Sequence, residues 1–183
     1  MLDADRASRI RILGLDVDGV LTDNAVFIGE VDGNRVELKR FDIQDGLGHR
    51  LMVHAGIEVI WVSGRQSAAT RLRGAELGVG VVLQVPADGK VAAIQEVLDA
   101  RGVSWDALAF VGDDLADIPV LERCGLPIAV ANAVPQVKRL AAHVTSACGG
   151  HGAVREVIDT LLHARGEYDR AMAIYRTNAD RAS

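Results

Sequence analysis

Two aspartates separated by one residue, Asp16 and Asp18, follow directly on an apolar run in this chain of 183 residues. The apolar residues between positions 10 and 15 predict a short buried strand, and Gly19 allows a sharp turn just beyond its end. Because alternate residues of a strand point the same way, the two carboxylates can converge on one point. Such a pair can bind a divalent cation while one carboxylate attacks a substrate and the other moves a proton. Taken alone, the pair could also belong to a loop in which an aspartate caps a turn or helix.

Three further polar clusters occupy comparable places, where a predicted strand ends or the next helix begins. They are Ser63-Gly64-Arg65, Lys90, and Asp113-Asp114 with Asp117. Each cluster alone could be explained as a helix cap or a solvated helix residue. Together with the aspartate pair, and in this order, they predict one catalytic site at the edge of a sheet where its strands end, called the catalytic edge below.

The chemistry that fits this combination is phosphoryl transfer. Asp16 is placed to attack a phosphoryl group, which splits hydrolysis into two steps through an aspartyl-phosphate. Asp18 is the candidate acid that protonates the leaving alkoxide and later deprotonates water. A metal ion, Lys90 and the Ser63 hydroxyl would neutralise the oxygens of the transferring group. Crowded carboxylates raise the pKa of at least one of their number, and bound Mg²⁺ offsets their repulsion.

Strands and helices that alternate along the chain must position these residues. The alternation predicts an α/β fold with a doubly wound, Rossmann-like parallel sheet, in which ligands bind at the carboxyl ends of the strands. Strands are predicted at 10–15, 57–62, 79–83, 107–111, 126–130 and around Val144, and helices at 45–55, 68–77, 88–102, 118–123, 137–141 and 154–162.

One insertion interrupts this alternation. Two β-prone stretches around Asp32-Gly33 predict a hairpin within residues 25–41. Its first arm is apolar at four successive positions, Ala25 to Ile28, and therefore needs cover on both faces. The length of the chain fits a single domain over residues 1–183, with this hairpin and a C-terminal helical tail at 166–183.

Composition excludes several classes of function. A net charge of −5 without a basic run argues against general nucleic-acid binding. No run approaches 18 apolar residues, and the charged start of the chain has no apolar core of a signal peptide, so we expect a cytoplasmic protein that does not bind membranes. Cys124 and Cys148 lack metal-ligand or redox spacing, and we expect reduced thiols.

The four clusters resemble the motifs of the haloacid dehalogenase superfamily of phosphohydrolases. The matching residues are Asp16-Val17-Asp18-Gly19-Val20, then Ser63, then Lys90, then Gly112-Asp113-Asp114 with Asp117. The resemblance implies a haloacid dehalogenase-like core with Mg²⁺ as cofactor, and it implies that Asp114 and Asp117 support the metal site.

The same resemblance implies a role for each remaining motif residue. Asp16 would be the nucleophile and a Mg²⁺ ligand, and Asp18 the acid and base, with its backbone carbonyl on the metal. Asp113 would be a further Mg²⁺ ligand. Ser63 and Lys90 would bind the phosphoryl oxygens.

Longer stretches resemble a narrower family of phosphatases that act on a phosphorylated sugar acid and supply lipopolysaccharide synthesis. These stretches are Gly19-Val20-Leu21-Thr22-Asp23, the hairpin, Phe41 to Gly46, Ser63-Gly64-Arg65, Gly112 to Pro119, and Gly149 to Glu156. The family implies a homotetramer whose C-terminal region approaches a neighbouring active site. Gly64, Arg65 and Arg155 then join Ser63 and Lys90 as candidate substrate-binding residues. The glycines before Arg155 could offer amides to an anion, or could simply cap a helix.

Three departures from this narrower pattern leave the substrate open. Gln44 replaces an expected arginine, His49 replaces an aliphatic residue, and the stretch 84–89 before Lys90 is one residue longer. Another sugar-acid phosphate, a phenylphosphate-type subunit and a non-catalytic phosphatase-like subunit are therefore alternatives. A receiver domain of two-component signalling is disfavoured because no acceptor aspartate precedes Ser63. A P-loop is disfavoured because Gly89-Lys90 lacks the other residues of that motif.

The gaps between motifs bear on quaternary structure. Phosphohydrolases of this superfamily commonly carry a cap domain after the first motif or between the second and third. The gaps from Asp18 to Ser63 and from Ser63 to Lys90 are too short for one. We expect hairpins of several subunits to pack together in a homotetramer, so that each subunit covers a neighbour's site. A hairpin folded back on its own sheet is the alternative.

Overall fold

A six-stranded parallel sheet lies at the centre of the computed structural model, which describes residues 2–180. The order of its strands is β5-β4-β1-β6-β7-β8. The first strand, β1, pairs in parallel with β4 on one side and with β6 on the other. The strands are β1 (Ile12–Asp16), β4 (Glu58–Ser63), β5 (Val81–Gln84), β6 (Leu108–Gly112), β7 (Leu126–Ala129) and β8 (His143–Val144). The predicted doubly wound α/β fold is confirmed.

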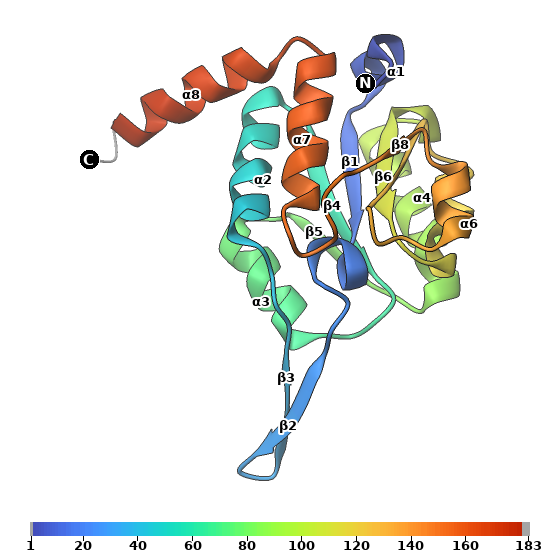
Figure 1. Ribbon diagram of the computed structural model, residues 1–183, viewed down its shortest axis with the longest axis vertical. Coiled ribbons are helices and arrows are strands. Elements are labelled where there is room, and N and C mark those ends of the chain that lie inside the picture. Colours follow the sequence, from blue (N-terminus) through green and yellow to red (C-terminus); the bar gives the residue numbers. More distant parts are fainter. Residues whose placement is uncertain (1, 181–183) are drawn as a thin grey trace.

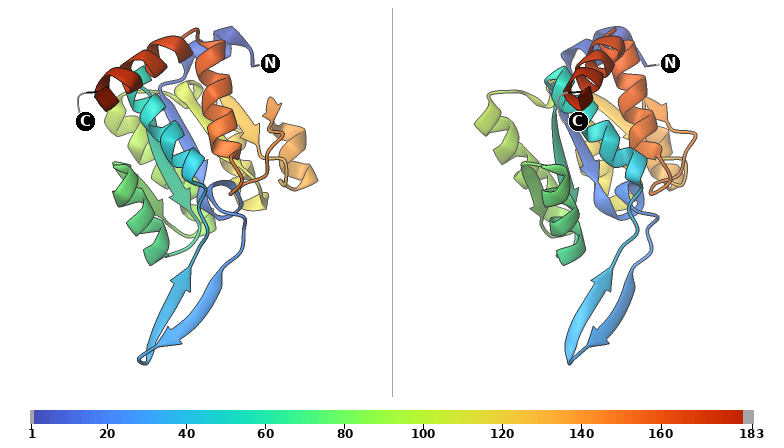
Figure 2. Two further views of the ribbon diagram at one scale, coloured as in Figure 1. Left: turned by 60° about the vertical axis from the view of Figure 1, so that its left-hand side comes forward. Right: turned by 90° about the vertical axis from the view of Figure 1, so that its left-hand side faces the viewer.

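Helices cover both faces of the sheet. Helices α2 and α7 lie side by side on one face, and α4 lies on the opposite face (Figure 1 and Figure 2). Helix α8 continues from α7 and packs against α2. The helices are α1 (Ala4–Arg9), α2 (Ile43–Ala55), α3 (Ala68–Leu77), α4 (Lys90–Arg101), α5 (Ile118–Leu121), α6 (Pro135–Leu140), α7 (Ala153–Ala164) and α8 (Tyr168–Asp180).

The central strand β1 is buried along its whole length, as its apolar sequence requires. Gly14 stands in the middle of it because a Cβ atom there would lie 2.7 Å from the ring of Phe110 on the neighbouring strand β6. This close packing fixes β1 between β4 and β6. The strand end that carries Asp16 is therefore held rigidly in the middle of the sheet.

The predicted hairpin is formed by β2 (Phe27–Val31) and β3 (Asn34–Leu38), which pair antiparallel. The turn residues Asp32 and Gly33 have φ angles of 51° and 74°, as a tight hairpin turn requires. The hairpin extends away from the sheet and the helices (Figure 1). The alternative in which it folds back on its own sheet is therefore wrong.

Several boundaries differ from the expected ones for local reasons. Helix α2 begins at Ile43 because the Asp42 side chain accepts a hydrogen bond from the Gln44 amide and caps the helix. Helix α1 was not expected, since its charged sequence contributes only Ala7 to the core. Helix α8 occupies most of the expected tail, whose residues 181–183 lie outside the described residues. Among the described residues, no helix has both the length and the apolar character that crossing a bilayer requires.

Candidate active site

The carboxyl ends of three parallel strands bring the predicted motifs together. Asp16 ends β1, Ser63 ends β4, and Asp113 follows the last residue of β6. Lys90 begins α4 and reaches the same edge. A cavity of about 230 Å³ opens there. The candidate residues that line it are Asp16, Asp18, Gly64, Arg65, Lys90, Asp113, Asp114 and Asp117.

Lys90 is buried between two carboxylates. Its Nζ atom lies 2.5 Å from Asp16 Oδ1 and 2.8 Å from Asp117 Oδ1. Burial opposes the charged form of Lys90, but the two carboxylates outweigh that effect and raise its pKa. Lys90 is thus a permanent cation next to the atoms of Asp16 that would attack a phosphoryl group.

Asp16, Asp113 and Asp117 form a cluster that could hold a metal ion, because one carboxylate oxygen of each lies within 4.8 Å of the others. Burial, and then the charges of Asp117 and Asp113, raise the pKa of Asp16. Burial, with Asp117 and Asp114, raises the pKa of Asp113 to about 7. Charged oxygens that repel one another in a buried site are the donor set that suits Mg²⁺. The residues present therefore fit a divalent cation.

Within this cluster Asp117 is already engaged by the protein. Its Oδ1 atom binds Lys90, and its Oδ2 atom accepts a hydrogen bond of 3.0 Å from the Asp113 amide. A Cβ atom on Gly112 would lie 2.7 Å from Asp117, so a glycine is needed before Asp113. Asp117 thus uses both of its oxygens to orient Lys90 and the Asp113 loop, whereas Asp16 contacts Lys90 through Oδ1, so Asp16 Oδ2 and the Asp113 carboxylate are the better candidates to bind a cation.

The turn after β1 places Asp18 beside this cluster. Gly19 adopts a φ of 103°, and a Cβ atom there would clash with the Asp113 carboxylate. Only a glycine lets the turn approach Asp113 so closely. The Asp18 Oδ2 atom accepts a hydrogen bond of 3.3 Å from the Ser63 hydroxyl. Asp18 and Ser63 are thus in direct contact.

Two functional candidates come from the hairpin and were missed in the sequence. Lys39 places its Nζ atom 2.7 Å from Asp18 Oδ1. Glu37 accepts a hydrogen bond of 3.3 Å from Arg65, one of the residues that line the cavity. The alternation of Glu37 and Lys39 with apolar residues marked a polar face of the hairpin arm, but it could not show that this face meets the active site.

Arg155 is not brought to the cavity within this chain. Its side chain binds Asp159 one turn further along α7, with distances of 2.9 and 3.0 Å to the two carboxylate oxygens. Its amide donates a hydrogen bond of 2.8 Å to the buried Asp45 carboxylate, which caps the start of α7. The substrate-binding role of Arg155 stays a prediction.

The glycine-rich loop before α7 is explained by close packing. A Cβ atom on Gly149 would clash with the Gly19 carbonyl, and one on Gly150 would lie 2.4 Å from the Asp23 amide. The Gly149 amide donates to Asn132, and the Gly150 amide donates to Val20. These two amides therefore support the first motif and are not free for an anion.

The three departures from the narrower pattern have different surroundings. His49 lies outside the cavity, where it projects from α2 and packs against the Trp61 side chain of β4. Gln44 is exposed at the start of α2. Within the stretch 84–89, Ala87 lines the catalytic cavity, so this stretch is the departure that touches the site.

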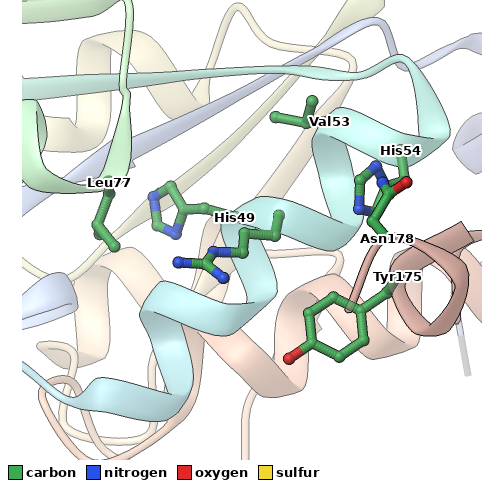
Figure 3. Close-up of a pocket in the computed structure, with 7 residues that line it drawn as sticks. His49, Val53, His54, Leu77, Tyr175 and Asn178 are labelled. Carbon is green, nitrogen blue, oxygen red and sulfur yellow. The ribbon is translucent and has the colours of Figure 1, made fainter. Parts of the chain in front are cut away.

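A second hollow, of about 310 Å³, lies between α2 and α8 (Figure 3). His49, Val53 and His54 line it from α2, while Tyr175 and Asn178 line it from α8. None of the predicted site residues lines this hollow. It is separate from the catalytic edge.

Comparison with known proteins agrees with the geometry of the site. Residues 83–158 match the family model of the haloacid dehalogenase-like hydrolases, and the chain belongs to this class of phosphatases. It is 43% identical to the 3-deoxy-D-manno-octulosonate 8-phosphate phosphatase KdsC of Salmonella typhi over 91% of this chain and 86% of that protein.

Solved structures of such phosphatases have the same fold. The enzyme of Moraxella catarrhalis, in complex with a magnesium ion, a phosphate ion and KDO, aligns with a TM-score of 0.87 at 32% identity, over 94% of this chain and 97% of that chain. The cobalt-bound enzyme of Haemophilus influenzae aligns with a TM-score of 0.80 at 35% identity, over 89% and 93% of the two chains. Both relatives were thus solved with a divalent cation.

Proposed function

We propose that the protein is a Mg²⁺-dependent phosphatase that releases phosphate from 3-deoxy-D-manno-octulosonate 8-phosphate through an aspartyl-phosphate on Asp16. The observation that carries the proposal is the contact of Asp16 with the buried cation Lys90, at a strand end shared with Asp113 and the Asp18 turn. The 43% identity to the Salmonella typhi phosphatase supports the substrate.

Each side chain has a distinct task in the two steps. A carboxylate oxygen of Asp16 forms a bond to phosphorus as the bond to the sugar oxygen breaks, and the Asp18 carboxyl gives that oxygen its proton. The Asp18 carboxylate then takes a proton from water, which attacks the same phosphorus and frees Asp16. Lys90 and Ser63 stabilise the phosphoryl oxygens.

A divalent cation held by Asp16, Asp113 and the Asp18 backbone carbonyl would neutralise charge on the phosphoryl group when bound. Gly64 and Arg65 line the cavity beside it, and Arg65 is suited to a substrate carboxylate because a guanidinium binds carboxylates in a bidentate manner. Arg155 would contribute from a neighbouring subunit. We further propose a homotetramer with a cytoplasmic location.

The test is a screen of phosphate release with Mg²⁺ present. The panel contains 3-deoxy-D-manno-octulosonate 8-phosphate, other sugar-acid phosphates and phenylphosphate. We expect the highest kcat/KM for the first compound. A higher value for another compound would replace the substrate but keep the reaction. An absence of phosphate release from every compound would support the non-catalytic alternative.

A further inference from the structure

We propose that Lys39 is a positioning residue for the reaction, because it holds the carboxylate of Asp18 in the orientation in which that group transfers protons. The inference rests on the proposed function, in which Asp18 is the acid and base. Lys39 is the first residue after β3, so it reaches the catalytic edge from the end of the hairpin and from outside the central sheet.

Lys39 and Ser63 both contact the carboxylate of Asp18. The Lys39 Nζ atom lies 2.7 Å from Asp18 Oδ1 and 3.4 Å from the hydroxyl of Thr70. Ser63 donates to the other oxygen, Asp18 Oδ2, at 3.3 Å. One oxygen of Asp18 therefore accepts a hydrogen bond from β4, and the other is paired by charge with the buried ammonium group at the end of the hairpin. Contacts at both oxygens restrict rotation of the carboxylate. A group that transfers protons in a fixed geometry needs this restriction.

The burial of Lys39 supports a specific task. Its side chain has a relative exposure of 0%, although the hairpin arm that precedes it is largely exposed. A buried ammonium group costs free energy unless it is paired and hydrogen-bonded. Glu37 Oε1 is a weaker partner at 3.8 Å, and no described basic side chain other than Lys39 forms an ion pair with Asp18. The ion pair with Asp18 and the hydrogen bond to Thr70 are thus what offset the burial of Lys39.

A purely structural role would be to attach the hairpin to the body of the protein. Arg40, the next residue, offers a matched control for that role. It donates a hydrogen bond of 2.8 Å to the Gly150 carbonyl and lies 3.9 Å from Asp23, so it also ties the hairpin end to the body. Arg40 does not line the catalytic cavity. Loss of either residue loosens the hairpin, but only loss of Lys39 disturbs Asp18.

The chemistry of the leaving group separates the two roles. A sugar alkoxide must receive a proton from Asp18 as its bond to phosphorus breaks, whereas p-nitrophenolate leaves without one. A misplaced Asp18 therefore slows cleavage of the sugar ester far more than cleavage of the aryl ester. A loosened or partly unfolded site slows both to the same degree, because the fraction of folded protein is common to the two substrates.

The experiment compares Lys39→Met, Arg40→Ala and the unaltered protein with Mg²⁺ present. Enzyme in excess over substrate isolates the first chemical step. The release of the alcohol is timed with 3-deoxy-D-manno-octulosonate 8-phosphate and with p-nitrophenyl phosphate. For Lys39→Met we expect at least about a tenfold slower release of the sugar, with the aryl ester slowed less than about threefold, since general acid catalysis contributes 10²–10⁴-fold. Arg40→Ala should leave the ratio of the two rates unchanged.

Two results overturn the inference on Lys39. One is equal slowing of both esters by Lys39→Met, and the other is the same change of ratio in Arg40→Ala. An unaltered protein that releases alcohol from neither ester instead overturns the proposed function, and the role of Lys39 with it. With an active unaltered protein, either of the first two results overturns the role of Lys39 and leaves the proposed function standing.

Discussion

The indole nitrogen of Trp61 donates a hydrogen bond of 2.8 Å to Nε2 of His49, which joins the sheet to helix α2 in the interior of the protein. The Nδ1 atom of His49 lies 2.9 Å from the Asp45 carbonyl oxygen. This geometry gives His49 a proton on Nδ1 and leaves Nε2 to accept. Burial lowers the pKa of His49, in keeping with a neutral ring. His49 is thus a packing partner of Trp61 that does not line the catalytic cavity.

We therefore predict that His49→Leu weakens the fold without altering catalysis. The Trp61 N–H group would be left buried without a partner, which costs about 1–3 kcal/mol in the free energy of unfolding. The kcat/KM value should stay within about twofold, because His49 does not line the catalytic cavity. Denaturant unfolding and steady-state kinetics measure the two effects. The matched control is the double change His49→Leu with Trp61→Phe, which removes both polar partners and should cost less than the sum of the single changes.

Asp16→Asn should abolish turnover while the protein stays folded. The amide cannot attack phosphorus, and loss of a nucleophile lowers kcat by more than about a thousandfold. The Lys90 ammonium keeps its partner Asp117, so the buried cation is not left alone. Phosphate release and a thermal melt are the two measurements. Near-normal turnover by the folded variant would rule out Asp16 as the nucleophile.

Activity should depend on a divalent cation. Asp16 and Asp113 are buried carboxylates with raised pKa values, so a cation is needed to offset their repulsion. Activity is expected to vanish in chelator and to return with Mg²⁺, while Ca²⁺ inhibits because of its larger and looser coordination. Titration of Mg²⁺ into chelated protein, followed by phosphate release, checks this. Full activity in chelator would contradict the metal site.

The convergence of the site could be predicted from the sequence because it follows from one rule of folding. Asp16, Ser63 and Asp113 each end or follow an apolar strand, and parallel strands end at one edge. No long-range detail was needed to infer that these residues meet. The boundaries of α2 and β5 differ from the predicted ones. Helix α2 begins two residues earlier because of the Asp42 cap, and β5 spans Val81–Gln84 because these are the residues that pair with β4.

The contacts of Lys39 could not be predicted in this way. They depend on the angle at which the hairpin leaves the sheet, and this angle is set by distant packing such as the hydrogen bond from Arg40 to the Gly150 carbonyl. The glycines at positions 149 and 150 were ambiguous for the same reason. The lack of room for a Cβ atom at these two positions becomes visible only when the turn after β1 is seen to lie against them.

Asp45 should make stability depend on pH. Burial raises its pKa from 3.8 to about 7, and its Oδ2 atom has no hydrogen-bond partner among the residues that the structure describes. The folded protein therefore retains a proton that the unfolded chain has lost between pH 4 and pH 7, so the contribution of Asp45 to stability falls as the pH rises through this window. The asparagine in Asp45→Asn does not titrate, so the variant lacks this pH-dependent loss of stability. Its side-chain oxygen can still accept the hydrogen bond from the Arg155 amide.

We expect the free energy of unfolding of Asp45→Asn, relative to the unaltered protein, to increase from pH 4 to pH 7 and to level off above. Urea unfolding at several pH values, with Mg²⁺ present throughout, measures this difference. A variant that loses more stability at pH 8 than at pH 5 would show instead that the start of α7 requires an ionised carboxylate.

The exposed hairpin should hold subunits together. Four large apolar side chains of one hairpin are each about three-fifths exposed: Phe27 at 60%, Ile28 at 62%, Val31 at 59% and Leu38 at 61%. A two-stranded hairpin with such a surface is marginal in water, and contiguous apolar patches of this kind mark interfaces. The described part of its own chain does not cover it, because the hairpin extends away from the body (Figure 2). Association of several copies through their hairpins would bury these side chains.

Phe27→Asp should therefore dissociate the predicted homotetramer and also lower kcat. A charge at this position opposes burial of the hairpin. Lys39 and Glu37, which contact Asp18 and Arg65, lie at the base of the same hairpin, so a loosened hairpin disturbs the site. Light scattering gives the mass, and phosphate release gives the activity. Glu30→Gln, on the exposed strand β2, is the matched control and should change neither. An unaltered protein that scatters as a fully active monomer would refute the assembly and its link to catalysis.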